Sequence, residues 1–421
     1  MGSLRVWNVN STFTGGGVAE MLRLLVGYAR GSGVDARWVV IDGTSEYFAV
    51  TKRLHNRLHG AAGDDGQLGP QETALYRAVL EDNAATLHQR VEPGDIVMLH
   101  DPQTAGLARQ LADRGAHVVW RCHIGTDRTN AYTREAWDFL IPHLSGCSAF
   151  VFSRTAYVPP ELTGSDVWII EPSIDPMSPK NRLLPRARMT ELLTQIGLLD
   201  GPSDSARHCV LGGAGSFSPN DRLVLQVSRW DPLKDMLGVM RGFSEYVAGP
   251  NTDAKLALIG PSVESVEDDP EAEKVLAECL ETWAALPRRV RSHVRLVALP
   301  MHDVDANALV VNAAQRHASI VVQKSLQEGF GLTITEAMWK SRAVVASAVG
   351  GIVDQMPPGV GVLLKDPRNL ESFGNTLNTL LAQPDEITRL GRRAHRHVRE
   401  RFLCDRHLQE LARLIEHLLS K

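Results

Sequence analysis

The chain has 421 residues, enough for two domains of the usual size of roughly 100–200 residues. Hydrophobic residues make up 43% and charged residues 22%, as in ordinary globular proteins, which excludes a disordered chain or a fibre. A formal net charge of −4 excludes a strongly basic nucleic-acid-binding protein, and the longest apolar runs fall far short of the ~20 residues that span a bilayer. We therefore expect no nucleic-acid partner and no membrane partner.

The cysteines and the N-terminus point to the same cellular compartment. The first residues run into a strand-like segment without the apolar stretch of a secretory signal. The five cysteines are scattered, without a C-x-x-C pair: Cys122, Cys147, Cys209, Cys279 and Cys404. This usage predicts reduced thiols and a cytoplasmic location.

Short apolar segments alternate with longer helical patterns in the first part of the chain. The expected strands are Arg5–Asn10, Ala36–Ile41, Asp95–Leu99, His117–Arg121, Ala149–Phe152 and Val167–Ile170. Helical patterns such as Val18–Arg30 and Gln71–Gln89 lie between them. Such alternation is typical of a parallel sheet with crossover helices, so residues 1–171 are predicted to form one Rossmann-like domain.

Residues 172–220 interrupt this alternation with six prolines, a glycine-rich stretch at 212–215 and one helical pattern, Arg186–Gln195. We expect an interdomain passage there. The alternation then resumes with expected strands at Leu223–Ser228, Lys255–Ile259, Val294–Ala298, Ser319–Gln323, Ala343–Ala346 and Gly361–Leu364. Residues 221–402 are thus predicted to form a second Rossmann-like domain, and 403–421 a C-terminal helix that can return to the first domain.

The fold class predicted by this order is α/β, with two Rossmann-like domains facing a central cleft. Open parallel sheets bind ligands beyond the carboxyl ends of their strands. Residues that follow strands are therefore the candidates for function.

A glycine-rich turn at 14–20 follows the first strand, with Gly15, Gly16 and Gly17 in succession. Glycines let backbone N–H groups approach an anion closely, and the N-terminus of the next helix adds partial positive charge. A plain tight turn has the same composition, so both interpretations stay open.

A pair of cations follows the first strand of the second domain. Arg229 and Lys234 lie five positions apart in the loop and at the start of the next helix. An arginine fork and a lysine point charge at the mouth of a sheet can clamp a diphosphate. The alternative is that Arg229 pairs with Asp231 or Asp235 on the surface.

Two carboxylates, Glu328 and Glu336, flank a Gly-Phe-Gly turn eight positions apart. A carboxylate accepts hydrogen bonds from sugar hydroxyls and so can fix the orientation of a sugar ring. The alternative for Glu336 is a favourable place in the first turns of a helix.

Taken together, the glycine-rich turn, the cation pair and the Glu-x7-Glu motif resemble the retaining glycosyltransferases of family 4, which have the GT-B fold. The resemblance is closest to the trehalose synthases of that family, which join nucleotide-activated glucose to free glucose. The segments that carry this closer likeness are 9–12, 15–20, 51–60, 100–103, 120–123, 299–301, 321–325 and 344–351.

The resemblance implies a retaining, metal-independent hexosyltransferase of the EC 2.4.1 type that needs no cofactor. Arg229 and Lys234 would hold the donor diphosphate, Glu336 the ribose and Glu328 the donor sugar. The implied catalytic residues are Arg229, Lys234, Glu328 and His123; the donor-binding residues are Gly16, Gly17, Gly260, Gly329, Phe330, Gly331, Leu332 and Glu336; the acceptor-binding residues are Asp101, Gln103, His123 and Asp127. The donor would be ADP-, GDP- or UDP-glucose, the acceptor a small carbohydrate, and a homodimer is the candidate assembly.

One departure from the family pattern concerns the loop that faces the acceptor in relatives. The trehalose synthases continue Cys-His-Ile with Asp, whereas this chain has Gly125, and its next acid is Asp127. The implied product is trehalose or a trehalose-like 1,1-linked sugar. The alternative is an enzyme of specialised, aminoglycoside-like metabolism whose acceptor is a modified or amino sugar.

Further alternatives stay open at this point. Asp303-Val-Asp305 resembles the D-x-D of metal-dependent transferases, but its place before the helical stretch Ala306–Gln315 predicts a helix cap and no metal. A nucleotide-sugar 2-epimerase, a trehalose phosphorylase-like enzyme and a non-catalytic sugar-nucleotide sensor are the competing functions. The absence of G-x-G-x-x-G disfavours a dehydrogenase.

Overall fold

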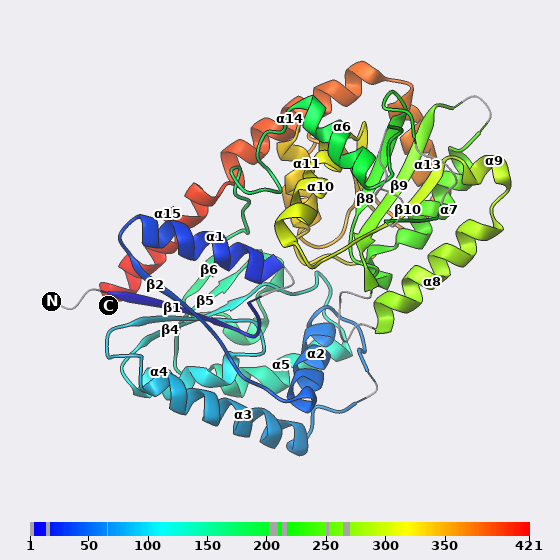
Figure 1. Cartoon of the computed structure of the whole chain (residues 1–421). Coiled ribbons are helices and arrows are strands. Elements are labelled where there is room, and N and C mark those ends of the chain that lie inside the picture. Colours follow the sequence, from blue (N-terminus) through cyan, green and yellow to red (C-terminus); the bar gives the residue numbers. More distant parts are fainter. Residues whose placement is uncertain are drawn as a thin grey trace. The chain divides into compact units, whose positions relative to one another are not determined.

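The computed structural model describes residues 4–13, 17–64, 66–201, 209–212, 217–249, 252–263 and 270–421. The chain divides into two compact units, one of Met1–Ser173 with Cys404–Lys421 and the other of Ile174–Leu403 (Figure 1). Each unit is built on its own sheet of mainly parallel strands, so the α/β class expected from the sequence is confirmed. Residues 174–220, from the expected interdomain passage, belong to the second unit.

The first unit contains a parallel six-stranded sheet in the order β2-β1-β3-β4-β5-β6. Its strands are β1 (Arg5–Asn10), β2 (Asp35–Val40), β3 (Ile96–His100), β4 (His117–Cys122), β5 (Cys147–Phe152) and β6 (Val167–Ile169). Each differs from the expected strand by at most two residues at either end. The chain runs from β1 out to β2 and then returns to the other side of β1 for β3, so the order reverses between β1 and β3.

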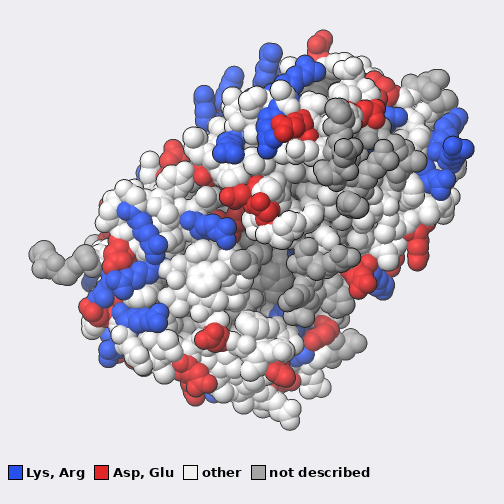
Figure 2. Space-filling model, in the orientation of Figure 1, with Lys and Arg blue, Asp and Glu red and all other residues white. Residues whose placement is uncertain are grey.

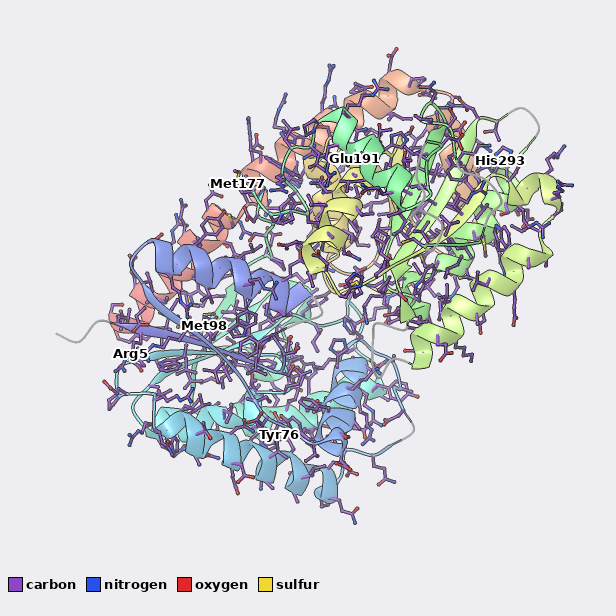
Figure 3. The ribbon with its side chains drawn as sticks, viewed as in Figure 1. Arg5, Tyr76, Met98, Met177, Glu191 and His293 are labelled. Atoms are coloured by element: carbon purple, nitrogen blue, oxygen red, sulfur yellow. The ribbon has the colours of Figure 1, made fainter. Side chains whose placement is uncertain are left out.

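Helices cover both faces of this sheet. One face carries α2 (Ser45–Leu58), α3 (Pro70–His88), α4 (Ala108–Asp113) and α5 (Ala131–Leu140), and the other carries α1 (Gly17–Gly31) and α15 (Cys404–Leu419) (Figure 1). Tyr76 of α3 and Met98 of β3, both labelled in Figure 3, belong to the cores on these two opposite faces. Alternation along β3 explains the division, because Val97 and Leu99 enter the first core while Ile96 and Met98 enter the second.

The second unit contains a seven-stranded sheet in the order β13-β12-β11-β8-β9-β10-β7. Its strands are β7 (Val210–Gly212), β8 (Arg222–Val227), β9 (Ala254–Pro261), β10 (Val294–Leu299), β11 (Ile320–Gln323), β12 (Ala343–Ser347) and β13 (Val362–Leu364). Only β7 is antiparallel, and it is the one strand of this sheet that the sequence did not predict. The order reverses between β8 and β11, as it does between β1 and β3 in the first unit.

Two hydrophobic cores flank the second sheet. On one face lie α7 (Met236–Tyr246), α8 (Pro270–Ala285) and α13 (Leu370–Leu381), and on the other α6 (Arg186–Gln195), α10 (Val304–His317) and α11 (Leu332–Trp339). Helix α14 (Pro384–Arg401) buries Leu390, Ala394 and Val398, and its exposed side carries a row of basic side chains (Figure 2). Short helices α9 (Arg288–Arg291) and α12 (Ile352–Gln355) complete the described helices of this unit.

Candidate active site

The switch point between β8 and β11 is the candidate donor site of the second unit. Ligands of open α/β sheets bind beyond the carboxyl ends of the strands where the strand order reverses. The segment 228–235 follows β8 and the segment 324–331 follows β11, so both loops start at this point. These two segments contain Arg229, Lys234 and Glu328.

An ion pair joins Lys234 to Glu328 across the two loops. The Lys234 Nζ donates to Oε1 of Glu328 at 2.8 Å and to Oε2 at 2.7 Å. Both side chains are mostly buried, with 17% and 10% of their surface exposed. Glu328 Oε2 also accepts from the Ser325 hydroxyl at 3.1 Å, while Gln323 donates to Ser325 at 2.9 Å. The structure therefore brings together a cation and a carboxylate that are 94 positions apart in the sequence.

Arg229 is the more exposed of the two predicted cations. Its guanidinium pairs with Asp231 Oδ2 at 3.0 Å, and 63% of its side chain is exposed. The other oxygen of Asp231 accepts from the backbone N–H of Leu233 at 2.8 Å and so caps the short helix η6 (Pro232–Lys234). The pairing with Asp231 is one of the two that the sequence left open for this arginine.

A buried lysine, Lys324, fixes the loop that carries Lys234, and sequence analysis did not identify it. Lys324 is fully buried and forms an ion pair with Asp235. Asp235 has a φ of 50° and caps α7 by accepting from Gly238 N–H at 3.1 Å. Gln226 connects the same elements, since its amide donates to the Lys234 carbonyl at 2.7 Å and accepts from the Lys324 N–H at 3.1 Å.

Glu336 lies in α11, where it is 2% exposed. The Lys180 Nζ lies 3.3 Å from its Oε1. Lys180 comes from the proline-rich segment before α6, and the sequence contains no signal that links it to Glu336. A buried carboxylate requires such a positively charged partner. The alternative explanation, a favourable interaction with the helix dipole, does not apply, because Glu336 lies beyond the first turn of α11.

The glycine-rich segment around Phe330 is explained mostly by packing. Gly331, the N-cap residue just before α11, has a φ of 89°, a conformation that favours glycine. Phe330 is 7% exposed and packs edge-to-face on Phe402. A Cβ on Gly260 would lie 2.5 Å from the Trp230 ring, so this glycine is required by the indole beside it. Gly329 accepts from Gly351 N–H at 3.2 Å, and Leu332, which starts α11, packs on the neighbouring core.

The switch point of the first unit lies between β1 and β3 and is the candidate acceptor site. Asn8 and Asn10 are on β1, His100 ends β3 and Asp101 follows it. His123 follows β4, the next strand in the sheet. The structure thus brings together Asp101 and His123, as the sequence led us to expect for this unit.

A hydrogen-bonded row joins Asn8, His100 and His123. His100 Nε2 lies 3.1 Å from Asn8 Oδ1, and its Nδ1 lies 3.1 Å from His123 Nε2. Burial, together with the nearby Arg121 cation, lowers the pKa of His100 to about 3, and burial lowers the pKa of His123 well below its usual value. Both imidazoles are therefore neutral at physiological pH.

Asp101 occupies a strained position at the end of β3. Its φ of 63° lies in the left-handed region, and its Oδ1 accepts from the His123 backbone N–H at 2.7 Å. Burial raises the pKa of this carboxyl to about 7. A carboxyl held beside a histidine with such a pKa is typical of functional sites.

A second buried network lies behind this site and was missed by sequence analysis. Arg121 is 1% exposed and donates to His407 Nε2 at 2.8 Å, while His407 Nδ1 lies 2.9 Å from the Ser173 hydroxyl. Burial lowers the pKa of Arg121 to about 9 and lowers that of His407 well below its usual value. His407 comes from α15, so the C-terminal helix contributes a polar side chain to the interior of the first unit.

The remaining predicted residues are less closely gathered. Asp127 is exposed and forms an ion pair with Arg154, and Gln103 is held through its carbonyl by the Tyr47 hydroxyl. Gly17 begins α1, whereas Gly16 lies outside the described residues.

The Asp-x-Asp motif noted in the sequence lies at the start of a helix, where the sequence predicted a helix cap. Asp303 caps α10 by accepting from Ala306 N–H at 2.9 Å. Within the described part of the chain, no group of three or more His, Cys, Asp or Glu side chains is arranged to hold a metal ion. Among the described helices, none combines the length and apolar character needed to cross a bilayer.

Known proteins resemble this chain over almost its whole length. Residues 8–159 match the family profile "Trehalose synthase, N-terminal domain", and residues 214–397 match "Glycosyl transferases group 1". The chain is 35% identical to a trehalose synthase of Rubrobacter xylanophilus over 99% of its own length and 91% of the relative's. It is 34% identical to a trehalose synthase of Pyrococcus horikoshii, over 98% and 89% of the two lengths.

Solved structures share the fold. An α,α-trehalose 6-phosphate synthase from Burkholderia multivorans superposes with a TM-score of 0.75 at 15% identity, over 99% of this chain and 97% of that one. Two parallel-sheet α/β units with this likeness define the GT-B fold. The match to the group 1 glycosyltransferases and the trehalose synthase relatives show that the chain is a glycosyltransferase, an enzyme that transfers hexose. Within that class, the identity to known members over nearly the full length shows that the chain belongs to the trehalose synthase family. The resemblance noted from its motifs is confirmed.

Proposed function

We propose that this enzyme transfers a glucosyl residue from a nucleoside diphosphate to the anomeric hydroxyl of a sugar, with retention of configuration. The product would be trehalose or a trehalose-like 1,1-linked sugar. The Lys234–Glu328 pair at the switch point of the second unit carries this proposal. It offers a cation for the diphosphate and a carboxylate for the sugar hydroxyls. When the sugar nucleotide binds, Lys234 would contact the diphosphate and Glu328 the sugar hydroxyls in place of each other.

The chemical step follows from where charge develops. When the bond between C1 and the diphosphate breaks, negative charge grows on the departing oxygen, and Lys234 and Arg229 would stabilise it. Removing one such preorganised hydrogen-bond donor from an active site typically lowers the rate by about 10²–10³. The acceptor hydroxyl would attack from the face that the diphosphate leaves, and the departing phosphate oxygen would take its proton. No protein nucleophile is required, so Glu328 would only bind the sugar.

The other residues have supporting roles. Glu336, beside Lys180, would accept hydrogen bonds from the ribose hydroxyls. In the first unit, Asp101 and His123 would orient the acceptor hydroxyl.

A matrix of substrates tests this function. ADP-, GDP- and UDP-glucose are each combined with free hexoses and amino sugars, and the linkage of each product is determined by NMR. We expect a 1,1-linked disaccharide with the donor's anomeric configuration, and a rate that EDTA leaves unchanged. Formation of glucose 1-phosphate from trehalose and inorganic phosphate would instead favour a phosphorylase, and a product linked elsewhere would contradict the proposed acceptor position.

A pair of lysine variants tests the donor site. Lys234→Ala should lower kcat by about 10²–10³. Lys255→Ala is the matched control. Lys255 lies near the amino-terminal end of β9, whereas the site lies beyond the carboxyl ends of the strands, so its loss should leave kcat unchanged. Equal rates for the two variants would contradict the assignment of the diphosphate to Lys234.

A further inference from the structure

The two histidines of the first unit meet edge to edge. The planes of the His100 and His123 rings differ by 11°, and their centroids are 5.4 Å apart. The two facing nitrogens are 3.1 Å apart. Nearly parallel rings can combine so short a nitrogen distance with so long a centroid distance only if the nitrogens point at each other in the ring planes. This is the geometry of an N–H···N hydrogen bond.

The position of each hydrogen in this row follows from Asn8. Its Oδ1 can only accept, so His100 Nε2 carries the hydrogen that it donates to Asn8. A neutral imidazole carries one hydrogen, which leaves Nδ1 of His100 as an acceptor. The hydrogen bond to His123 must then be donated by His123 Nε2, so its Nδ1 carries no hydrogen.

We infer that Asn8 and His100 are positioning residues that hold His123 as the tautomer protonated on Nε2, so that Nδ1 accepts a hydrogen bond from a hydroxyl group of the reacting sugars. The inference rests on the proposed function, in which His123 contacts the sugars. It adds the direction of the hydrogen bond: the His123 Nδ1 accepts a hydrogen bond from a sugar hydroxyl and does not donate one. It also explains why a buried histidine and a buried asparagine stand behind His123, where apolar side chains would cost less to bury.

The tautomer can be measured directly in the intact enzyme. Two-bond ¹H–¹⁵N correlation spectra of histidine-labelled protein distinguish a hydrogen on Nε2 from one on Nδ1, and the His123→Gln spectrum identifies the signals of His123. We expect both His100 and His123 as neutral Nε2–H tautomers at pH 7. A hydrogen on Nδ1 of His123 in the wild-type enzyme would overturn the inference.

Two substitutions at His100 separate positioning from packing. The oxygen of an asparagine occupies the place of Nδ1, so His100→Asn keeps an acceptor for His123, whereas His100→Gln keeps only the partner of Asn8. We expect His100→Gln to lower kcat by about 10- to 100-fold, the range seen when a residue that orients a metal-bound histidine is lost, without change in the KM for the sugar nucleotide. His100→Asn should restore most of kcat. A general loss of packing would affect both variants alike, and equal rates would overturn the inference.

Controls distinguish failure of this inference from failure of the proposed function. His143 is another buried histidine of the first unit, 9% exposed and packed on Tyr76, so His143→Gln should leave kcat and the His123 spectrum unchanged. Full activity of His123→Ala would overturn the role of His123 and with it the proposed acceptor site, whatever the spectrum shows. An inactive His123→Ala together with an unchanged His123 tautomer in His100→Gln would overturn the positioning role alone.

Discussion

The family resemblance leads one to expect aspartate at position 125, and the structure predicts that Gly125→Asp would destabilise this chain by steric overlap with Tyr157. A Cβ at position 125 would lie 2.3 Å from Cγ, 2.6 Å from Cδ1 and 2.8 Å from Cβ of Tyr157. Separations under 3.0 Å between such atoms essentially never occur. Either the tyrosine or the loop must therefore move.

The size of the effect follows from how firmly Tyr157 is held. Its side chain is 3% exposed within the core of the first unit, and the Arg154 guanidinium lies 5.3 Å from the ring centroid. Overfilling a packed core costs about 1–3 kcal/mol, and the upper end applies because three atoms of one buried tyrosine side chain are overlapped. For a unit of this size, ~3 kcal/mol corresponds to a fall of about 6–12 °C in Tm.

Thermal unfolding of a small variant set tests this reasoning. Gly27→Asp is the matched control, because Gly27 is exposed on α1 and a Cβ there meets nothing within 4 Å, so its effect should stay within about 0.5 kcal/mol. In a Tyr157→Ala background the ring is gone and only the 2.8 Å contact with Cβ remains, so Gly125→Asp should then cost clearly less than in the wild-type enzyme. The same loss of Tm with and without the tyrosine would refute the steric explanation.

Two further predictions concern stability. His100 and His407 are neutral in the folded protein because burial lowers their pKa values, that of His100 to about 3, so the unfolded chain takes up protons first as the pH falls below ~6.5. The free energy of unfolding, from urea titrations between pH 7.5 and 5, should therefore change little above pH ~6.5 and fall below it by up to about 1.4 kcal/mol per pH unit for each histidine. Asp101, whose pKa is raised to about 7, acts in the opposite sense between ~4 and 7 but offsets at most one histidine, so a stability that rises between pH 6 and 5 would contradict the neutral state of the two histidines. Lys324→Met should lower the free energy of unfolding by about 3 kcal/mol, since it breaks a buried ion pair, whereas the exposed Lys365→Met should have no effect; equal urea midpoints for these two variants would contradict the structural role of Lys324.

The sequence predicted the parallel strands because each is a short apolar run followed by a helical pattern, and the strand ends then identified the site. Lys234, Glu328, Asp101 and His123 all follow strands in this way. The antiparallel strand β7 was not predicted, since three residues in a glycine-rich stretch carry no periodicity. Edge strands of this kind form because a neighbouring strand, here β10, offers unpaired backbone groups.

The partners of buried charges could not be predicted, because periodicity shows which side of an element is buried but not what it meets. Lys180 approaches Glu336, and Lys324 approaches Asp235, from segments far away in the sequence. In each case the charge alone would have suggested an exposed side chain. Only the fold shows that Lys324 is fully buried, that Lys180 is partly buried, and that each is paired with a carboxylate.

Helix α15 shows how polar contacts decide what an apolar pattern leaves undetermined. Its buried leucines, Leu414 and Leu418, predict a helix that packs on a sheet, and either sheet of this protein would serve that purpose. A buried Arg121 needs a hydrogen-bond acceptor that carries no positive charge, because a second cation beside it would be costly. The neutral imidazole of His407 meets this need at 2.8 Å. The last residues of the chain therefore complete the first unit through one specific hydrogen bond as well as through apolar packing.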